Sequence, residues 1–192
     1  KIEKSVLKNA SSLITVSEPL RKILQKKYPE IPSHTIMNAF DDKDFKISRE
    51  KISNKNFNIV YTGSVYEGKR DPTPLFEALV LGNKLKNKVQ VNFFGNNLGF
   101  VDSLIKKYKL GECVITNSEV SRKESLERQK NAQLLLLLTW NNPKEIGILT
   151  GKLFEYIGSG VPILSIGAIN DEASNLIKKN QFGIASNNSA EI

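Results

Sequence analysis

The chain has 192 residues, of which 40% are hydrophobic and 25% are charged, so it can bury a sizeable core and is not a disordered or low-complexity protein. A single cysteine and a single histidine exclude an internal disulfide and disfavour a structural zinc site, and we expect no metal and no cofactor. The net charge of +8 favours anionic partners, such as nucleotides, nucleic acid or an anionic membrane surface, without choosing among them.

The longest apolar run, Leu134 to Leu138, is too short to span a bilayer, and the lysine-containing N-terminus lacks the apolar core of a signal peptide. We therefore expect a cytoplasmic location, which leaves room for peripheral contact with the inner face of the membrane. The chain begins with Lys1 and stops in a polar segment, 189–192, that resembles the start of a helix. We expect it to be a piece of a longer protein.

The first part of the chain predicts a small strand-helix-strand unit followed by a linker. The expected elements are a strand at Ser12–Val16, a helix from Ser17-Glu18-Pro19 to just before Pro29, a strand at His34–Asn38 and an unpatterned polar stretch at Ala39–Asn56. Because the linker separates this unit from the rest, we expect residues 12–38 to lie outside the main sheet. We divide the chain into a unit at 1–45 and a larger unit at 46–192.

From residue 57 onward, short apolar strands alternate regularly with helical stretches, and no hairpin signal interrupts them. The expected strands are Phe57–Gly63, Val89–Gly95, Cys113–Asn117, Gln133–Trp140, Val161–Ile166 and Phe182–Ser186. The expected helices lie near 72–83, 99–109, 121–131, 150–158 and 170–179, with caps at Asp71-Pro72 and at the capping box Ser121–Glu124. This order predicts an α/β fold with a doubly wound, Rossmann-like parallel sheet of about six strands and helices on both faces.

The segment Gly63-Ser64-Val65-Tyr66-Glu67-Gly68-Lys69-Arg70 follows a strand and precedes a capped helix, which is the context of a phosphate-binding loop. It nearly matches the P-loop pattern, but Arg70 stands where that pattern needs a hydroxyl for magnesium. A glycine turn followed by Lys69 and Arg70 remains suited to a phosphate group. The alternative is an ordinary surface loop with two exposed cations.

The segment from Gly147 to Pro162 is the second candidate. Free amide groups at a helix start near Thr150 would face a diphosphate, and Lys152 would add positive charge. Glu155 stands between apolar helix residues, where a carboxylate can accept hydrogen bonds from the two hydroxyls of a ribose. The alternative is a helical glutamate that pairs with Lys152, three residues earlier.

These segments resemble retaining nucleotide-sugar glycosyltransferases of the GT-B fold, of the family-4 kind, which contain two Rossmann-like domains. The resemblance covers nearly the whole chain. Its motifs are Ser11–Glu18 for the last unit of the N-terminal domain, Asn38-Ala39-Phe40-Asp41 with Phe45 for the hinge, Tyr61-Thr62-Gly63 with Lys69 for the phosphate loop, and Gly147 to Glu155 with Gly160-Val161-Pro162 for the E-x7-E segment. By this resemblance, residues 1–45 are the tail of an acceptor domain with its hinge and residues 46–192 are a donor-binding domain.

The resemblance implies transfer of a sugar, with retention, from a nucleotide-diphosphate sugar to a sugar or lipid-linked acceptor in cell-envelope or surface polysaccharide synthesis. It assigns Lys69 and Arg70 to stabilising the leaving diphosphate. The remaining residues of the implied substrate site are Gly63, Ser64, Glu145, Gly147, Leu149, Thr150, Gly151, Lys152 and Glu155. The nucleotide sugar is a substrate and not a cofactor, no nucleic acid is implied, and a piece without most of its acceptor domain is expected to be inactive.

The sequence departs from the family pattern at two positions. The arginine of the phosphate loop falls at Ser64, and the first glutamate of E-x7-E falls at Gly147, with Glu145 as its candidate replacement. Two other functions stay open: a nucleotide hydrolase that uses residues 63–69 as a P-loop, and a non-catalytic basic module that binds nucleic acid or an anionic membrane. The first lacks an aspartate at the end of its best apolar strand, and the second lacks cations interleaved with exposed aromatics.

Overall fold

A computed structural model describes residues 2–7, 9–46, 56–82, 87–142 and 145–192. Its main unit is a six-stranded sheet in the order β5-β4-β3-β6-β7-β8, in which every neighbouring pair is parallel. The strands are β3 (Phe57–Thr62), β4 (Val89–Phe94), β5 (Val114–Asn117), β6 (Leu134–Leu138), β7 (Ile163–Ile166) and β8 (Gly183–Ala185). The predicted parallel sheet is therefore confirmed, strand by strand.

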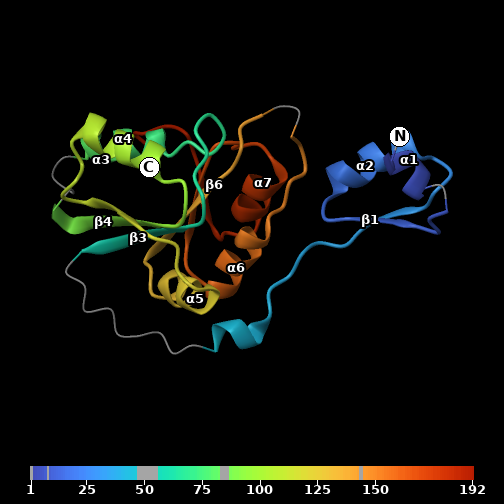
Figure 1. Ribbon diagram of the computed structural model, residues 1–192, viewed down its shortest axis with the longest axis horizontal. Coiled ribbons are helices and arrows are strands. Elements are labelled where there is room, and N and C mark those ends of the chain that lie inside the picture. The colour runs from blue at the N-terminus through green and yellow to red at the C-terminus, as the bar shows by residue number, and fades with distance from the viewer. Residues whose placement is uncertain (1, 8, 47–55, 83–86, 143–144) are drawn as a thin grey trace.

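Five helices cover the two faces of this sheet (Figure 1). They are α3 (Thr73–Leu81), α4 (Gly99–Tyr108), α5 (Arg122–Lys130), α6 (Gly151–Ser159) and α7 (Glu172–Lys179). Helices α3 and α4 share one hydrophobic core with the sheet, and α6 and α7 share a second core on the other face. The doubly wound arrangement predicted from the sequence is confirmed.

The run of leucines in β6 explains why this strand shows no alternation of polar and apolar residues. Leu136 and Leu138 belong to the core under α3 and α4, whereas Leu135 and Leu137 belong to the core under α6 and α7. All four side chains are almost completely buried. A central parallel strand is covered on both faces, so each of its positions favours an apolar side chain.

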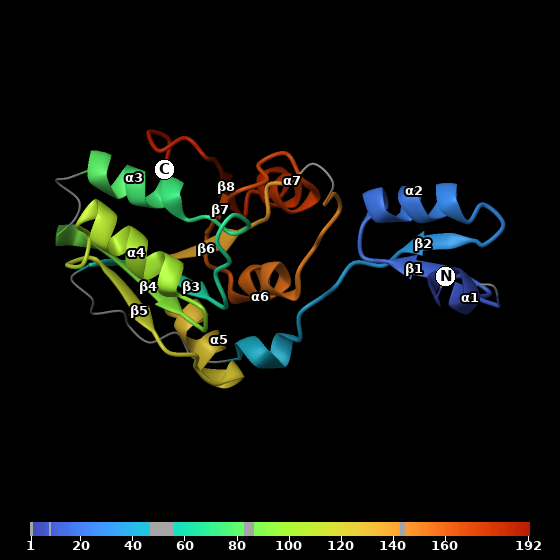
Figure 2. The ribbon, with the colours of Figure 1, turned by 45° about the horizontal axis from the view of Figure 1, so that its top comes forward.

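A small N-terminal lobe lies at one end of the molecule (Figure 2). It contains α1 (Ile2–Leu7), β1 (Leu13–Thr15), α2 (Glu18–Lys27) and β2 (Ser33–Thr35), and β1 and β2 form a separate parallel pair. The expectation that this region stays out of the main sheet is confirmed. The predicted second strand, 34–38, is wrong in its bounds, because the three-residue β1 offers β2 no further partner beyond the bond from the Ile36 amide to the Thr15 carbonyl.

Residues 39–46 differ from the expected unpatterned linker, whereas residues 47–55 of that linker lie outside the described part of the chain. The 3-10 helix η1 (Asp42–Phe45) follows Phe40, and the rings of Phe40 and Phe45 meet edge to face at 5.7 Å between centroids. Phe45 is buried, and both rings lie against Gly158 of α6. This part of the segment is therefore packed onto the main unit.

The helix caps agree with the sequence at one site and differ at another. The Ser121 hydroxyl accepts a hydrogen bond from the Glu124 amide at 3.2 Å, so it caps α5 as predicted. At α3 the cap residue is Pro72, one residue after the predicted cap Asp71, although the Asp71 carboxylate still accepts a hydrogen bond from the Thr73 amide at 2.8 Å. Within the described residues, no helix has the length and apolar character needed to cross a bilayer.

Candidate functional site

The strand order of the main sheet reverses between β3 and β6. From β3 the chain proceeds outward to β4 and β5, and from β6 it proceeds outward to β7 and β8. Ligands of open parallel sheets bind at the carboxyl ends of the strands beside such a reversal. The loop 63–72 leaves β3 at this point, and the segment that connects β6 to α6 leaves beside it.

A cleft of about 310 Å³ lies between these two segments and is lined by Lys69, Arg70 and Lys152. The prediction that the three cations converge on one cleft is confirmed, although Lys152 is far from the other two in sequence. The lining also includes Tyr66, Trp140, Glu145, Ile148, Thr150 and Asp171. The cleft therefore combines three basic side chains with two carboxylates, those of Glu145 and Asp171.

Aromatic rings hold the two loop cations. The Lys69 ammonium lies 4.6 Å from the centroid of the Trp140 ring, and the Arg70 guanidinium lies 5.5 Å from that of Tyr66. Arg70 also donates a hydrogen bond to the Ser64 carbonyl at 3.3 Å, and the Tyr61 hydroxyl donates to the same carbonyl at 2.8 Å. These contacts restrict both side chains to the edge of the cleft.

Gly63 marks the point where β3 turns into the loop. Its φ of +122° is open to glycine but disfavoured for other residues, and its amide donates to the Phe94 carbonyl at 2.7 Å. A Cβ on Gly63 would meet the Lys152 ammonium, and a Cβ on Gly95 would meet the Gly63 backbone. The two glycines therefore allow β3, β4 and Lys152 to come together.

Lys152 lies in the first turn of α6 and is largely buried. Its ammonium donates to the Thr62 carbonyl and lies 4.2 Å from the centroid of the Tyr61 ring. Burial, reinforced by the nearby Arg70 guanidinium and only partly offset by Glu155, lowers the pKa of Lys152 from 10.5 to about 7. The proposed pairing of Lys152 with Glu155 is not found as an ion pair between these two described residues.

Helix α6 points its N-terminus toward the cleft. Thr150 occupies the cap position and lines the cleft, and its side chain makes no capping bond with the described residues of the helix. The backbone at Leu149 is fixed, because its carbonyl accepts a hydrogen bond from the Asn38 side chain at 3.2 Å. Because Thr150 and Lys152 both line the cleft, the start of α6, where backbone amides have no partner within the helix, borders the cleft.

The structure does not bring Gly147 into the cleft. It is buried with a φ of +79°, and its carbonyl accepts a hydrogen bond from the Ser17 hydroxyl at 2.6 Å. A Cβ there would lie 2.6 Å from the Ser17 hydroxyl and 3.1 Å from Pro19, so the first position of E-x7-E cannot hold a glutamate in this arrangement. Glu145, the candidate replacement for the missing glutamate, does line the cleft.

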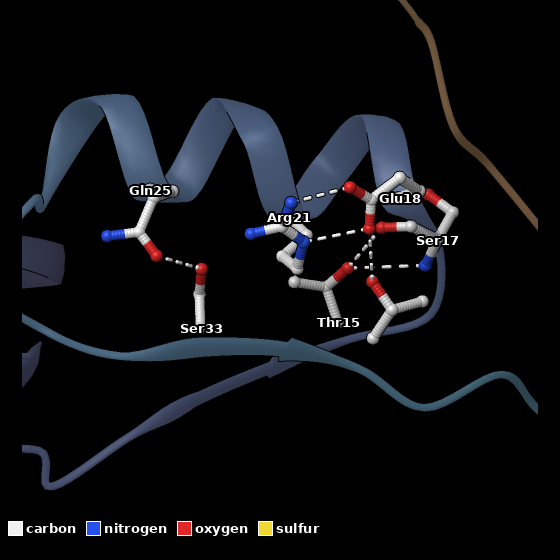
Figure 3. A network of polar contacts seen from close by, with 7 residues as sticks. Thr15, Ser17, Glu18, Arg21, Gln25 and Ser33 are labelled. Carbon is white, nitrogen blue, oxygen red and sulfur yellow. Dashed lines mark hydrogen bonds and ion pairs between the residues drawn. The ribbon is translucent and has the colours of Figure 1, made fainter.

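A polar network fixes the start of α2 (Figure 3). The Ser17 hydroxyl, which donates to the Gly147 carbonyl, belongs to this part of the chain. The Thr15 hydroxyl donates to the Ser17 carbonyl at 2.8 Å and accepts from the Ser17 amide at 3.2 Å. Arg21 forms a two-pronged ion pair with Glu18, at 2.8 and 2.5 Å, which holds the pKa of that carboxyl at about 2. The N-terminal lobe thus presents a hydrogen-bonded edge to the segment that enters α6.

Glu155 faces a second hollow, of about 290 Å³, which lies next to the cleft. Gly63, Ser64 and Lys152 also line this hollow, so Lys152 forms part of the wall of both spaces. Its remaining wall comes from Thr62, Phe94, Gly95, Asn96, Glu119, Val120, Arg122 and Ser125. Of the predicted substrate residues, Glu145 and Thr150 line the cleft, Gly63, Ser64 and Glu155 line the hollow, and Lys152 lines both, whereas Gly147, Leu149 and Gly151 line neither space.

Gln129 is completely buried behind Glu155 and donates a hydrogen bond to its carboxylate at 3.4 Å. It also donates to the Thr62 hydroxyl at 3.1 Å. Gln129 was not predicted from the sequence, and neither were Tyr66, Trp140 and Asp171 of the cleft. Two signals were present, because Trp140 follows a buried strand and Asp171 begins a helix after the next strand.

The loop 63–72 does not have the geometry of a P-loop. A P-loop leads its lysine directly into a helix, whereas Arg70, Asp71 and Pro72 separate Lys69 from the first residue of α3. Arg70 also lines the cleft as a cation, where a magnesium-binding hydroxyl would be needed. The hydrolase alternative is disfavoured for both reasons.

The sequence matches no family model and no curated protein. Among solved structures, it is similar to HepE from Anabaena in complex with UDP, with a TM-score of 0.73 and 19% identity over 95% of this chain and 52% of HepE. It is also similar to WaaG, a glycosyltransferase involved in lipopolysaccharide biosynthesis, with a TM-score of 0.70 and 18% identity over 91% of this chain and 48% of WaaG.

A TarM variant from S. aureus, solved with UDP among its ligands, has a TM-score of 0.69 and 17% identity over 98% of this chain and 38% of TarM. The chain thus spans about half the length, or less, of the structures that it resembles. At these identities the likeness concerns the fold. The main sheet with its five helices has the fold of a Rossmann-like half of the GT-B architecture.

Proposed function

We propose that the chain is the donor-binding part of a retaining glycosyltransferase that uses a nucleotide-diphosphate sugar. The observation that carries the proposal is the convergence of Lys69, Arg70, Lys152 and the N-terminus of α6 on one cleft at the strand reversal. Three cations and a helix N-terminus suit a diphosphate. HepE and TarM, whose fold this chain shares, were solved with UDP.

The two adjoining spaces suit two parts of one ligand. The diphosphate would occupy the cleft, and the nucleoside would extend past Lys152 into the hollow where Glu155 lies. The Glu155 carboxylate would accept hydrogen bonds from the two ribose hydroxyls, and Gln129 would hold it in position. Glu145, which lines the cleft and not the hollow, would contact the donor sugar in place of a glutamate at 147.

The chemical role of these residues is to stabilise the leaving group. When the bond between the sugar and the diphosphate breaks, negative charge accumulates on a phosphate oxygen, and Lys69 and Arg70 lie where they would oppose it. Retention rests on the resemblance found in the sequence, which implies attack by the acceptor on the face that the diphosphate leaves. The acceptor, a sugar or a lipid-linked sugar in cell-envelope synthesis, would meet the rest of the N-terminal domain.

Removal of the Glu155 carboxylate tests the proposal. We expect Glu155→Ala to weaken binding of the preferred nucleotide by at least about tenfold, because charge-assisted hydrogen bonds contribute about 1.5–3 kcal/mol and 1.4 kcal/mol is one decade in affinity. Calorimetric titration of UDP, GDP and ADP into the intact chain measures the effect. The matched control is Glu112→Ala, which removes an exposed glutamate outside both spaces and should leave affinity unchanged.

If the native chain and Glu155→Ala bind the nucleotide with equal affinity, and thermal melts show that both are folded, then Glu155 does not bind the ribose. If no nucleotide binds while a salt-sensitive gel shift appears at low micromolar protein, the basic-module alternative replaces the glycosyltransferase.

A further inference from the structure

The ammonium group of Lys152 has fewer hydrogen-bond acceptors around it than it has N–H donors. An ammonium group has three N–H donors, and the contacts of Lys152 are one carbonyl, that of Thr62, and the face of the Tyr61 ring. Among the described residues it forms no ion pair. A cation that is largely removed from water and has no carboxylate in direct contact is costly, and a lysine can avoid this cost by losing its proton.

The charged neighbours of Lys152 come from several elements. Arg70, from the loop after β3, opposes the charged form of Lys152, whereas Glu155, one turn further along α6, favours it. The cleft also contains Lys69, Glu145 and Asp171, and the hollow contains Glu119 and Arg122. Burial and the nearest cation together outweigh Glu155, which places the pKa of Lys152 at about 7.

We infer that Lys152 takes up a proton from solvent when a nucleoside diphosphate enters the cleft, so that donor binding and protonation of this lysine are coupled. The inference rests on the proposed function, because it requires the diphosphate to lie beside Lys152. In the empty site at pH 8 the neutral amine still donates to the Thr62 carbonyl. When the diphosphate arrives, the nitrogen lone pair binds a proton, and the new ammonium donates to a phosphate oxygen. When the diphosphate leaves, the proton returns to solvent.

The direction of the coupling follows from charge. A diphosphate next to the ammonium favours its charged form, so the pKa of Lys152 is higher in the complex than in the free chain. Above pH 7 the free chain must gain a proton in order to bind, and affinity therefore falls as pH rises. With a pKa of about 7 in the free chain, we expect affinity to fall about eightfold between pH 7.5 and 8.5.

Calorimetric titration of UDP and GDP at pH 8, in HEPES and in Tris, measures the number of protons taken up. The two buffers differ in ionisation enthalpy, so the difference in observed binding enthalpy reports the protons that the buffer releases. The terminal phosphate of the nucleotide, whose last ionisation lies near pH 6, is already fully ionised at this pH. We expect uptake of about 0.9 proton per nucleotide, because an amine with a pKa near 7 is about nine-tenths neutral at pH 8.

Three variants assign the proton to its site. Lys152→Arg keeps a permanent charge and Lys152→Met carries none, so neither should take up a proton or show the fall in affinity above pH 7.5. If Lys152→Arg does not fold, the comparison of Lys152→Met with the native chain still shows whether Lys152 is the group that takes up the proton. Lys106→Met, on the exposed side of α4, is the control and should keep both the uptake and the pH dependence.

Binding of a nucleotide by the native chain without proton uptake would overturn the inference and leave the proposed function standing. Uptake that persists in Lys152→Met would also overturn it, because the proton would then belong to another group. Failure of all the nucleotides to bind between pH 6 and 9 would overturn the proposed function, and the inference with it.

Discussion

Lys152 links the stability of the fold to pH as well as to ligand binding. Its pKa is about 7 in the folded chain and near 10.5 when the chain is unfolded, so between these values the unfolded state binds more protons than the folded state. The contribution of Lys152 therefore makes the free energy of unfolding rise with pH from about 7 toward 10. Below pH 7 both states carry the proton, and this contribution becomes constant.

Chemical denaturation of the native chain and of Lys152→Met, at half-unit steps from pH 6.5 to 9.5 and without nucleotide, measures this contribution. We expect the difference in unfolding free energy between the two proteins to change with pH above 7 and to level off below it. Parallel profiles across the whole range would show that Lys152 keeps its ordinary pKa in the fold.

The sequence was sufficient to predict where the three cations of the site lie, but not to predict every residue that lines it. Lys69, Arg70 and Lys152 follow strands or begin a helix, and the carboxyl ends of parallel strands share one edge of the sheet. Gly147 was assigned to the site by its spacing from Glu155. Its burial against Ser17 depends on a contact between distant parts of the chain, which spacing along one segment cannot show.

At the scale of elements, α6 is fixed on its outer side by the two phenylalanines of the hinge segment. A Cβ on Gly158 would lie 2.5 Å from Phe45 and 2.7 Å from Phe40, so the ring pair occupies the space where a side chain would stand. Gly158→Ala should destabilise the chain by about 1–3 kcal/mol through overpacking, although alanine is the better helix former. Urea denaturation measures the change.

Gly99→Ala is the matched control for this prediction. Gly99 also lies in a helix, α4, but a Cβ there would meet no atom within 4 Å, so the same substitution should be neutral or stabilising. If Gly158→Ala proves as stable as Gly99→Ala, the rings of Phe40 and Phe45 do not hold α6 in solution.

Strand and helix positions were predictable because most main elements have a clear period or cap, but the pattern alone does not determine the strand order. The order β5-β4-β3-β6-β7-β8 depends on which face each crossover takes.

The helices α1 and η1 were missed for a local reason. They have six and four residues, too few to show a period, and α1 is held by contacts of Glu3 with Lys27 and Tyr28.

At the scale of the whole molecule, the N-terminal lobe contacts the segment that enters the site. The Ser17 hydroxyl reaches the Gly147 carbonyl, and the Asn38 side chain reaches the Leu149 carbonyl. Both contacts lie just before the first turn of α6, which stands beside the cleft. The lobe and its extended connection therefore support the backbone that would bind the diphosphate. The division of the chain at residue 45 remains a prediction.

Mapping of nucleotide-induced changes in the amide spectrum of the ¹⁵N-labelled chain tests the central claim most directly. On titration with UDP and GDP, we expect the amides of 63–70 and 149–152 to shift most, together with those of 118–120 beside the hollow. Amides at the amino ends of the strands, such as those of 87–89 and 111–113, should remain in place. Shifts that gather at the amino ends, or that spread evenly over the surface lysines, would contradict a diphosphate site at the strand reversal.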